Sequence, residues 1–116
     1  MFRTPVLLIT FNRPHYIRQV LEVLKVVKPA YLYIYQDGAR DGNLTDNQKC
    51  AEVRSVFNEI NWPCELKTFF SPTNLGCGKG PSSGISWFFE QVEEGIILED
   101  DCVPEAAFFN YCTELL

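Results

Sequence analysis

The stretch "PVLLITFNRP", from Pro5 to Pro14, is the best starting point for the fold of this chain. Its run of aliphatic residues up to Phe11 is continuous, which predicts a strand covered on both faces, as in the middle of a parallel sheet. Pro14 then suits the first turn of a helix, where its missing N–H is not needed. The stretch therefore predicts a central strand followed at once by a helix.

The same alternation continues along the chain. Further strands are predicted at Tyr31–Gln36, Glu65–Phe70 and Gly95–Glu99. Each strand is followed by an apolar stripe of helical spacing. The four stripes are Ile17, Val20, Leu21, Leu24 and Val27; Cys50, Val53, Phe57 and Ile60; Ile85, Phe88, Phe89 and Val92; and Phe108, Cys112 and Leu115.

Three local patterns refine these boundaries. Thr45 and Gln48 have the spacing of a capping box at the start of the second helix. The segment "SPTNLGCGKGPSSG", from Ser71 to Gly84, predicts a long loop, because it is rich in Gly, Ser and Pro. Pro104 suits the first position of a last helix.

Strands that alternate with helices predict an α/β fold with a mostly parallel sheet. We expect a Rossmann-like, three-layer α/β/α arrangement in a single domain over residues 1–116. In such sheets, ligands bind beyond the carboxyl ends of the strands. Four segments should therefore share one crevice: "TFNRP", "QDGARD", the glycine-rich stretch and "EDD".

Composition excludes several classes of protein. The net charge is −5 and no basic cluster is present, which argues against nucleic acid as a partner. No apolar run reaches the ~20 residues that a membrane-spanning helix needs. The five cysteines form no C-x-x-C pair and there is one histidine, so a zinc site is not expected. Free thiols favour a reducing compartment such as the cytoplasm.

The stretch "GIILEDDCVPEA", from Gly95 to Ala106, places three acids directly after a predicted strand. Glu99, Asp100 and Asp101 repel one another unless a cation joins them. Mg²⁺ or Mn²⁺ would suit their oxygen ligands. A solvated acidic turn, with Asp100 or Asp101 capping the helix at Pro104, explains the pattern equally well.

Three other side chains are candidates for a nucleotide site. Asp37 could accept a hydrogen bond from a base or ribose, although Asp before Gly is also an ordinary turn pair. Arg13 stands where positive charge is mildly unfavourable against the helix dipole, which slightly favours an anionic ligand over an ordinary surface arginine near a helix start. Lys79 could reach a phosphate, but "NLGCGKG" matches neither common phosphate-loop pattern and a solvated lysine is the simpler explanation.

Taken together, "TFNR", "YQDG", the N-x-G segment and "LEDD" followed by "VPEAAFFNY" resemble the nucleotide-binding half of a GT-A glycosyltransferase. The layout is similar to the inverting family-2 transferases. In "YQDG", and in "LEDD" followed by "VPEAAFFNY", the chain looks closer to the N-acetylglucosaminyltransferase I family, whose metal motif is also Glu-Asp-Asp. The resemblance runs from about Val6 to the end of the chain.

The resemblance implies roles for individual residues. Phe11 and Arg13 stand where the family cradles the uracil and approaches the nucleotide. Asp37 matches the aspartate that holds the base. Lys79 has no firm counterpart and remains a phosphate candidate on its charge alone.

In the acidic motif, the resemblance implies that Asp101 binds Mn²⁺ or Mg²⁺ and that Asp100 lies near the ribose. Glu99 would face the donor sugar or support the metal. A cation that bridges the two phosphates stabilises the negative charge that grows on the leaving diphosphate.

The expected function is therefore transfer of a sugar from a nucleotide sugar, with a uridine nucleotide favoured, to an acceptor hydroxyl on a glycan, lipid or protein. We find no general base in the sequence, so we expect the chain to be the N-terminal part of a longer enzyme. A cytoplasmic enzyme, peripheral to a membrane or not, is expected; the secretory lumen is the alternative. A non-catalytic binding module and a nucleotidyltransferase remain open, although the latter should have a glycine-rich loop after the first strand.

Overall fold

The structure, a computed structural model, describes residues 2–101. All four predicted strands are present: β1 (Val6–Thr10), β2 (Tyr31–Gln36), β3 (Glu65–Phe70) and β4 (Ile96–Glu99). The helices are α1 (Pro14–Val27), α2 (Leu44–Val56) and α3 (Gly76–Phe89), with a short 3-10 turn, η1 (Phe57–Glu59), after α2. The helix predicted at Pro104, with Phe108, Cys112 and Leu115, lies outside the described residues.

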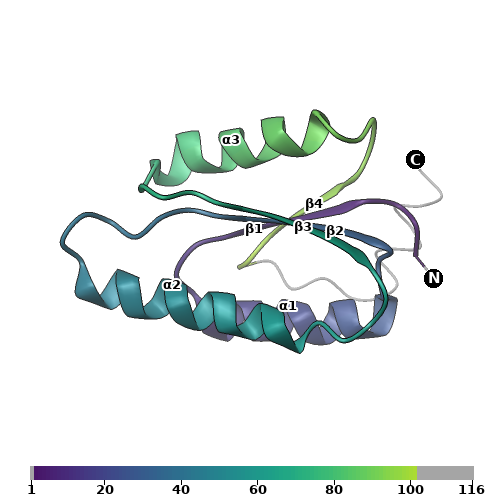
Figure 1. Cartoon of the computed structure of the whole chain (residues 1–116), viewed down its shortest axis with the longest axis horizontal. Coiled ribbons are helices and arrows are strands. Elements are labelled where there is room, and N and C mark those ends of the chain that lie inside the picture. Colours follow the sequence, from purple (N-terminus) through teal and green to yellow (C-terminus); the bar gives the residue numbers. More distant parts are fainter. Residues whose placement is uncertain (1, 102–116) are drawn as a thin grey trace.

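The strands form one sheet in the order β3-β2-β1-β4, and every pair is parallel (Figure 1). In the middle of the sheet, Val6 of β1 is in register with Leu32 of β2 on one side and with Ile96 of β4 on the other. The predicted α/β fold with a parallel sheet is confirmed. The strand order is that of a Rossmann-like half, in which the chain steps outward from β1 and then returns to its other side.

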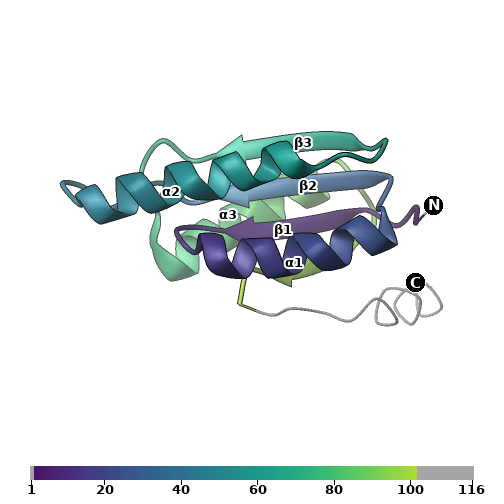
Figure 2. The same cartoon turned by 90° about the horizontal axis from the view of Figure 1, so that it is seen from below.

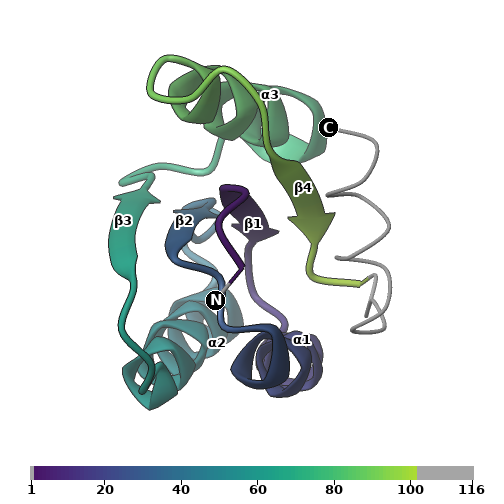
Figure 3. The ribbon, with the colours of Figure 1, turned by 90° about the vertical axis from the view of Figure 1, so that its right-hand side faces the viewer.

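Both faces of the sheet are covered (Figures 1 and 3). Val6 and Leu8 of β1 point toward α1 and α2, while Leu7 and Ile9 point toward Phe88 of α3. Side chains alternate along a strand, so a strand buried on both sides needs apolar residues at every position. This is why β1 is aliphatic from Val6 to Ile9, and all five of its residues, Thr10 included, are buried.

The two helices on one face lie side by side, and the third lies alone on the other (Figure 2 shows the sheet from the side of α1 and α2). Crossovers between parallel strands are almost always right-handed. Helices α1 and α2 accompany the outward steps from β1 to β3, so they share a face. Helix α3 accompanies the return from β3 to β4 and therefore lies on the opposite face.

The prediction of a long loop from Ser71 to Gly84 was wrong, because helix α3 begins at Gly76 and includes Pro81. One of its glycines, Gly84, has a packing reason. A Cβ atom on Gly84 would lie 2.7 Å from Cγ of Tyr35, so only glycine lets the helix rest directly on that ring. Composition predicted a loop, whereas Gly84 serves a close contact between helix and sheet.

The predicted capping box at Thr45 was also wrong. Helix α2 begins at Leu44, and its N-cap is Asn43, whose side chain accepts a hydrogen bond from the backbone N–H of Asp46 at 2.9 Å. Asn is as good an N-cap as Ser or Thr. Asn43 also has the extended backbone that the cap position requires, with φ −94° and ψ 100°.

Within residues 2–101, no helix has the length and hydropathy needed to cross a membrane. Cys50 is buried in the core between the sheet and α2, as predicted from its apolar helix position. Cys50, Cys64 and Cys77 are all free thiols.

Candidate functional site

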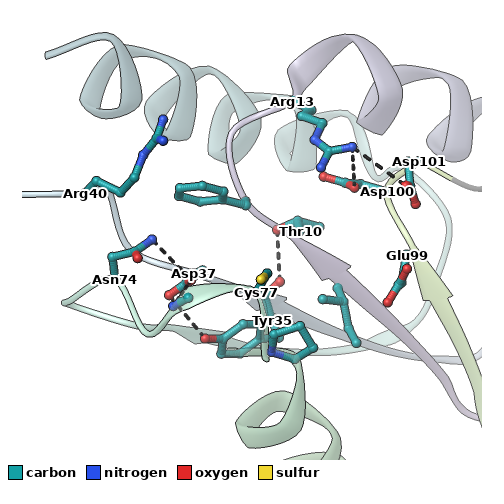
Figure 4. A pocket seen from close by; sticks show the side chains of 14 residues that line it. Thr10, Arg13, Tyr35, Asp37, Arg40, Asn74, Cys77, Glu99, Asp100 and Asp101 are labelled. Atoms are coloured by element: carbon teal, nitrogen blue, oxygen red, sulfur yellow. Dashed lines mark hydrogen bonds and ion pairs between the residues drawn. The ribbon is translucent and has the colours of Figure 1, made fainter. Parts of the chain in front are cut away.

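A cleft of about 410 Å³ opens at the carboxyl ends of the strands (Figure 4). Every segment that the sequence analysis expected to meet there contributes to its lining. The lining residues are Ile9, Thr10, Phe11 and Arg13; Tyr35, Asp37 and Arg40; Asn74, Gly76, Cys77 and Pro81; and Glu99, Asp100 and Asp101. The cleft thus lies where the strand order reverses around β1, the usual ligand position in open α/β sheets.

The acidic side chains gather at one end of the cleft, beside Arg13 (Figure 4). Asp100 is buried, while Glu99 and Asp101 are exposed. The Nη1 atom of Arg13 lies 4.0 Å from Oδ1 of Asp100 and 3.8 Å from Oδ2 of Asp101. In the structure, the guanidinium group of Arg13 is the positive charge that lies beside these two carboxylates.

Arg13 offsets only part of the negative charge at the end of β4. Burial raises the pKa of Asp100 above its usual range, and the nearby Asp101 and Glu99 raise it further, against the opposing effect of Arg13. The side chain of Arg13 is 49% exposed and both ion-pair distances are long, so water screens the attraction. The strand end therefore still favours additional positive charge.

A divalent ion could bind at the acidic end of the cleft only if a bound ligand supplied further coordinating atoms. Among residues 2–101, no group of three or more His, Cys, Asp or Glu side chains could hold a metal ion. Asp100 and Asp101 do offer carboxylate oxygens, the donors that Mg²⁺ and Mn²⁺ prefer. Such an ion normally keeps positions for substrate phosphates, so this small donor set suits an ion that arrives with a diphosphate.

Asp37 lies at the opposite side of the cleft floor and is buried. Its carboxylate accepts hydrogen bonds from the backbone N–H groups of Gly38 at 2.9 Å, Leu75 at 2.8 Å and Gly76 at 3.1 Å. The side-chain amide of Asn74 donates a fourth bond at 3.3 Å. Asp37 therefore holds the first turn of α3 against the end of β2, and any contact with a base would be additional to this task.

Tyr35 forms part of the floor beneath Asp37. Its hydroxyl donates to Oδ1 of Asp37 at 3.5 Å, and the hydroxyl of Thr10 donates to the Tyr35 carbonyl at 2.9 Å. Burial, followed by the charge of Asp37, raises the pKa of Tyr35 to about 12. The phenol stays protonated at neutral pH and serves as a donor and as a packing surface.

Phe11 contributes an aromatic wall, and Arg40 lies next to it. The guanidinium carbon of Arg40 is 6.0 Å from the centre of the Phe11 ring. Arg40 is held by Asp46, which accepts from its Nε at 2.6 Å and from its Nη2 at 2.8 Å. Sequence analysis missed both residues, because no motif links an arginine in a turn to an acid in the following helix.

Lys79 is the one predicted site residue that does not line the cleft. It is exposed on α3, whereas Cys77 and Pro81 of the same helix do contribute to the lining. On a helix, neighbouring residues point in different directions, and this separates Lys79 from the cleft. The predicted loop from Ser71 to Gly84 gave no reason to separate Lys79 from Cys77 and Pro81; the helix does.

The chain was compared with models of protein families, with curated proteins and with solved structures, and none of the three comparisons found a match.

Proposed function

We propose that the cleft binds a nucleoside diphosphate sugar together with a divalent ion, and that the chain is the donor-binding part of a metal-dependent glycosyltransferase. The fold we propose is the three-layer α/β/α nucleotide-binding half of the GT-A class. A uridine nucleotide is the favoured donor. The acceptor would be a hydroxyl group on a glycan, a lipid or a protein.

One observation supports this proposal above the others. The cleft has two chemically different ends, and both come from strand ends around the reversal of strand order (Figure 4). One end offers Phe11 and Arg40, which suit a planar base. The other offers Arg13, Asp100 and Asp101, which suit a diphosphate with its cation. A nucleoside diphosphate has the same division into a planar end and a charged end.

The roles follow from these positions. Asp101 would be the metal ligand, because it is exposed to the cleft, and Asp100 would lie behind it near the ribose. Arg13 would turn from the carboxylates toward the diphosphate. Glu99 would face the donor sugar or support the metal site. Lys79 is left out of the proposal, because it does not line the cleft.

A bound divalent ion would supply charge stabilisation for the departing diphosphate. The residues of this chain would bind and orient the nucleotide, and would keep the base and the phosphates at opposite ends of the cleft. The general base that an inverting transfer needs is not assigned to any described residue.

The compartment and the class of activity belong to the same proposal. Free thiols at Cys50, Cys64 and Cys77 agree with a reducing compartment, and we propose the cytoplasm. A non-catalytic nucleotide-sugar-binding module would use the same cleft. Release of UDP from UDP-sugars in the presence of simple acceptors would distinguish an enzyme from such a module.

The first test is removal of the proposed metal ligand. Isothermal titration should show that the chain binds UDP in Mn²⁺ and that EDTA abolishes binding. Asp101→Ala should remove the metal-dependent binding, while circular dichroism and thermal unfolding stay close to wild type, because the side chain is exposed. Asp41→Ala, at an exposed acid outside the cleft lining, is the matched control and should bind normally. Wild-type affinity in Asp101→Ala would refute the metal assignment.

A further inference from the structure

Arg40 has an unusually well-anchored side chain for a residue in an exposed turn. Its partner Asp46 is 1% exposed and accepts three hydrogen bonds from Arg40: from the backbone N–H at 3.0 Å, from Nε at 2.6 Å and from Nη2 at 2.8 Å. The side-chain amide of Asn12 donates to the same carboxylate at 2.9 Å. Asp46 thus ties the turn after β2 to the turn after β1.

This anchoring leaves one edge of the guanidinium group unused. The group has five N–H donors in a plane, and Asp46 uses those on Nε and Nη2. Among the described residues, no hydrogen bond or ion pair uses Nη1. The side chain is 58% exposed, lines the cleft and lies beside the Phe11 ring.

The position of Arg40 separates it from the acidic end. Figure 4 shows Arg40 and Asn74 at one end of the cleft, and Glu99, Asp100 and Asp101 at the other, with Arg13 beside the acids. The Nη1 atom of Arg13 lies within 4.0 Å of a carboxylate oxygen of Asp100 and of Asp101. A ligand that places its phosphates near Arg13 would therefore place its other end against Phe11 and Arg40.

We propose that Arg40 is a ligand-binding residue for the base of a nucleoside diphosphate, and that Asp46 is the positioning residue that holds it beside Phe11. This inference rests on the proposed function and extends it to the specificity of the same cleft. The free N–H donors of Arg40 match the carbonyl acceptors on the edge of a base such as uracil. The Phe11 ring offers the flat apolar surface that the face of the base needs.

Anchoring by Asp46 has a physical advantage for binding. A free arginine side chain loses considerable rotamer freedom when it grips a ligand. Arg40 has already lost that freedom in the folded protein, so its contact with the ligand is less opposed by entropy. A lysine could not reproduce the arrangement, because it lacks the planar fork that binds a carboxylate on one edge and a ligand on the other.

The experiment compares two probes by isothermal titration in Mg²⁺: UDP, which has a base, and inorganic pyrophosphate, which has none. Arg40→Met should weaken UDP binding by about tenfold, the effect of losing a charge-assisted hydrogen bond, and should leave pyrophosphate binding unchanged. Arg13→Gln should weaken both probes. Arg18→Met, at an exposed arginine of α1 outside the cleft lining, is the matched control and should change neither.

Asp46 is tested by a double-mutant cycle. Asp46→Asn should weaken UDP binding but not pyrophosphate binding, although the Arg40 side chain is still present. In the Arg40→Met background, Asp46→Asn should cause no further loss, because its effect passes through Arg40. Thermal unfolding shows whether Asp46→Asn is folded; if it is not, the comparison of Arg40→Met with Arg18→Met decides the proposal.

The results separate this inference from the proposed function. Normal UDP binding by Arg40→Met would overturn the inference while leaving the nucleotide cleft intact. Equal weakening of UDP and pyrophosphate would also overturn it, because Arg40 would then act on the phosphates. Failure of the wild-type chain to bind UDP at all would overturn both.

Discussion

Asp46 is a charged side chain that is almost completely buried, and its environment explains how the fold tolerates it. Burial alone would raise the pKa of a carboxyl group. The hydrogen bonds from Arg40, together with the one from Asn12, outweigh this effect and hold the pKa of Asp46 far below its usual range. Asp100 is the opposite case: the guanidinium group of Arg13 lies 4.0 Å away, and burial leaves the pKa of Asp100 raised.

The lowered pKa of Asp46 predicts a loss of stability in acid. In the unfolded chain this carboxyl titrates near its ordinary value of about 3.9, whereas in the native state it resists protonation. Its contribution to the free energy of unfolding is therefore complete above that pH and is lost as the pH falls toward the lowered native pKa. Urea denaturation between about pH 6 and pH 2.5 should show a steep decline.

The same series on Asp46→Asn should decline less steeply at the acid end, because the variant has no carboxyl group to protonate. Asp41→Asn, at an exposed acid in the turn before α2, is the control and should follow the wild-type slope more closely. Parallel curves for wild type and Asp46→Asn would mean that Asp46 contributes nothing to the acid response.

Helix α3 is built from residues that rarely favour helices. Glycine and proline both lower helix propensity, yet the helix runs from Gly76 to Phe89 with Pro81 inside it. Two contacts compensate. Asp37 accepts the N–H groups of Leu75 and Gly76 at its start, and the glycine surface at Gly84 lies on the Tyr35 ring. The helix is thus specified by its neighbours more than by its own sequence.

Two glycines of this helix should respond oppositely to alanine. In Gly84→Ala the new Cβ would lie 2.7 Å from Cγ of Tyr35, so we expect destabilisation by about 1–3 kcal/mol through overpacking. In Gly78→Ala the new Cβ meets nothing within 4 Å, so we expect stabilisation by about 0.5–1 kcal/mol. Urea denaturation measures both changes. Equal effects of the two substitutions would contradict the close contact between α3 and β2.

The strands of the sheet differ in how well they are shielded from solvent. Strands β1 and β2 lie inside the sheet with helices on both faces, and nearly all of their residues are buried. Within residues 2–101, strand β3 lies at the edge of the sheet beside β2, and most of its side chains are exposed. The cleft therefore rests on a rigid centre formed by the ends of β1 and β2, with β3 as a more open edge.

This difference predicts the order of amide hydrogen exchange. Amides of β1 and β2 should exchange last, at rates set by global unfolding, because they open only when both helical layers leave the sheet. Amides of β3 should exchange earlier through local opening. Exchange followed by mass spectrometry or NMR measures the order, and equal protection of β3 and β1 would contradict it.

The sequence by itself determined the alternation of strands and helices, the parallel sheet and the convergence of four segments at its carboxyl edge. The reason is local: apolar periodicity follows directly from which faces of a strand or helix are buried. The stretch from Pro5 to Pro14 is the clearest example, because every residue of β1 is covered.

Only the tertiary structure decided what several side chains do in the cleft. Asp37 turned out to hold the start of α3, Lys79 to lie outside the cleft, and Arg40 to be fixed by Asp46. These facts depend on contacts between segments distant in the sequence, for which no spacing rule exists. The glycine-rich stretch shows the same limit, since Gly80 and Gly84 of its helix pack closely on Asp37 and Tyr35, more than forty positions earlier.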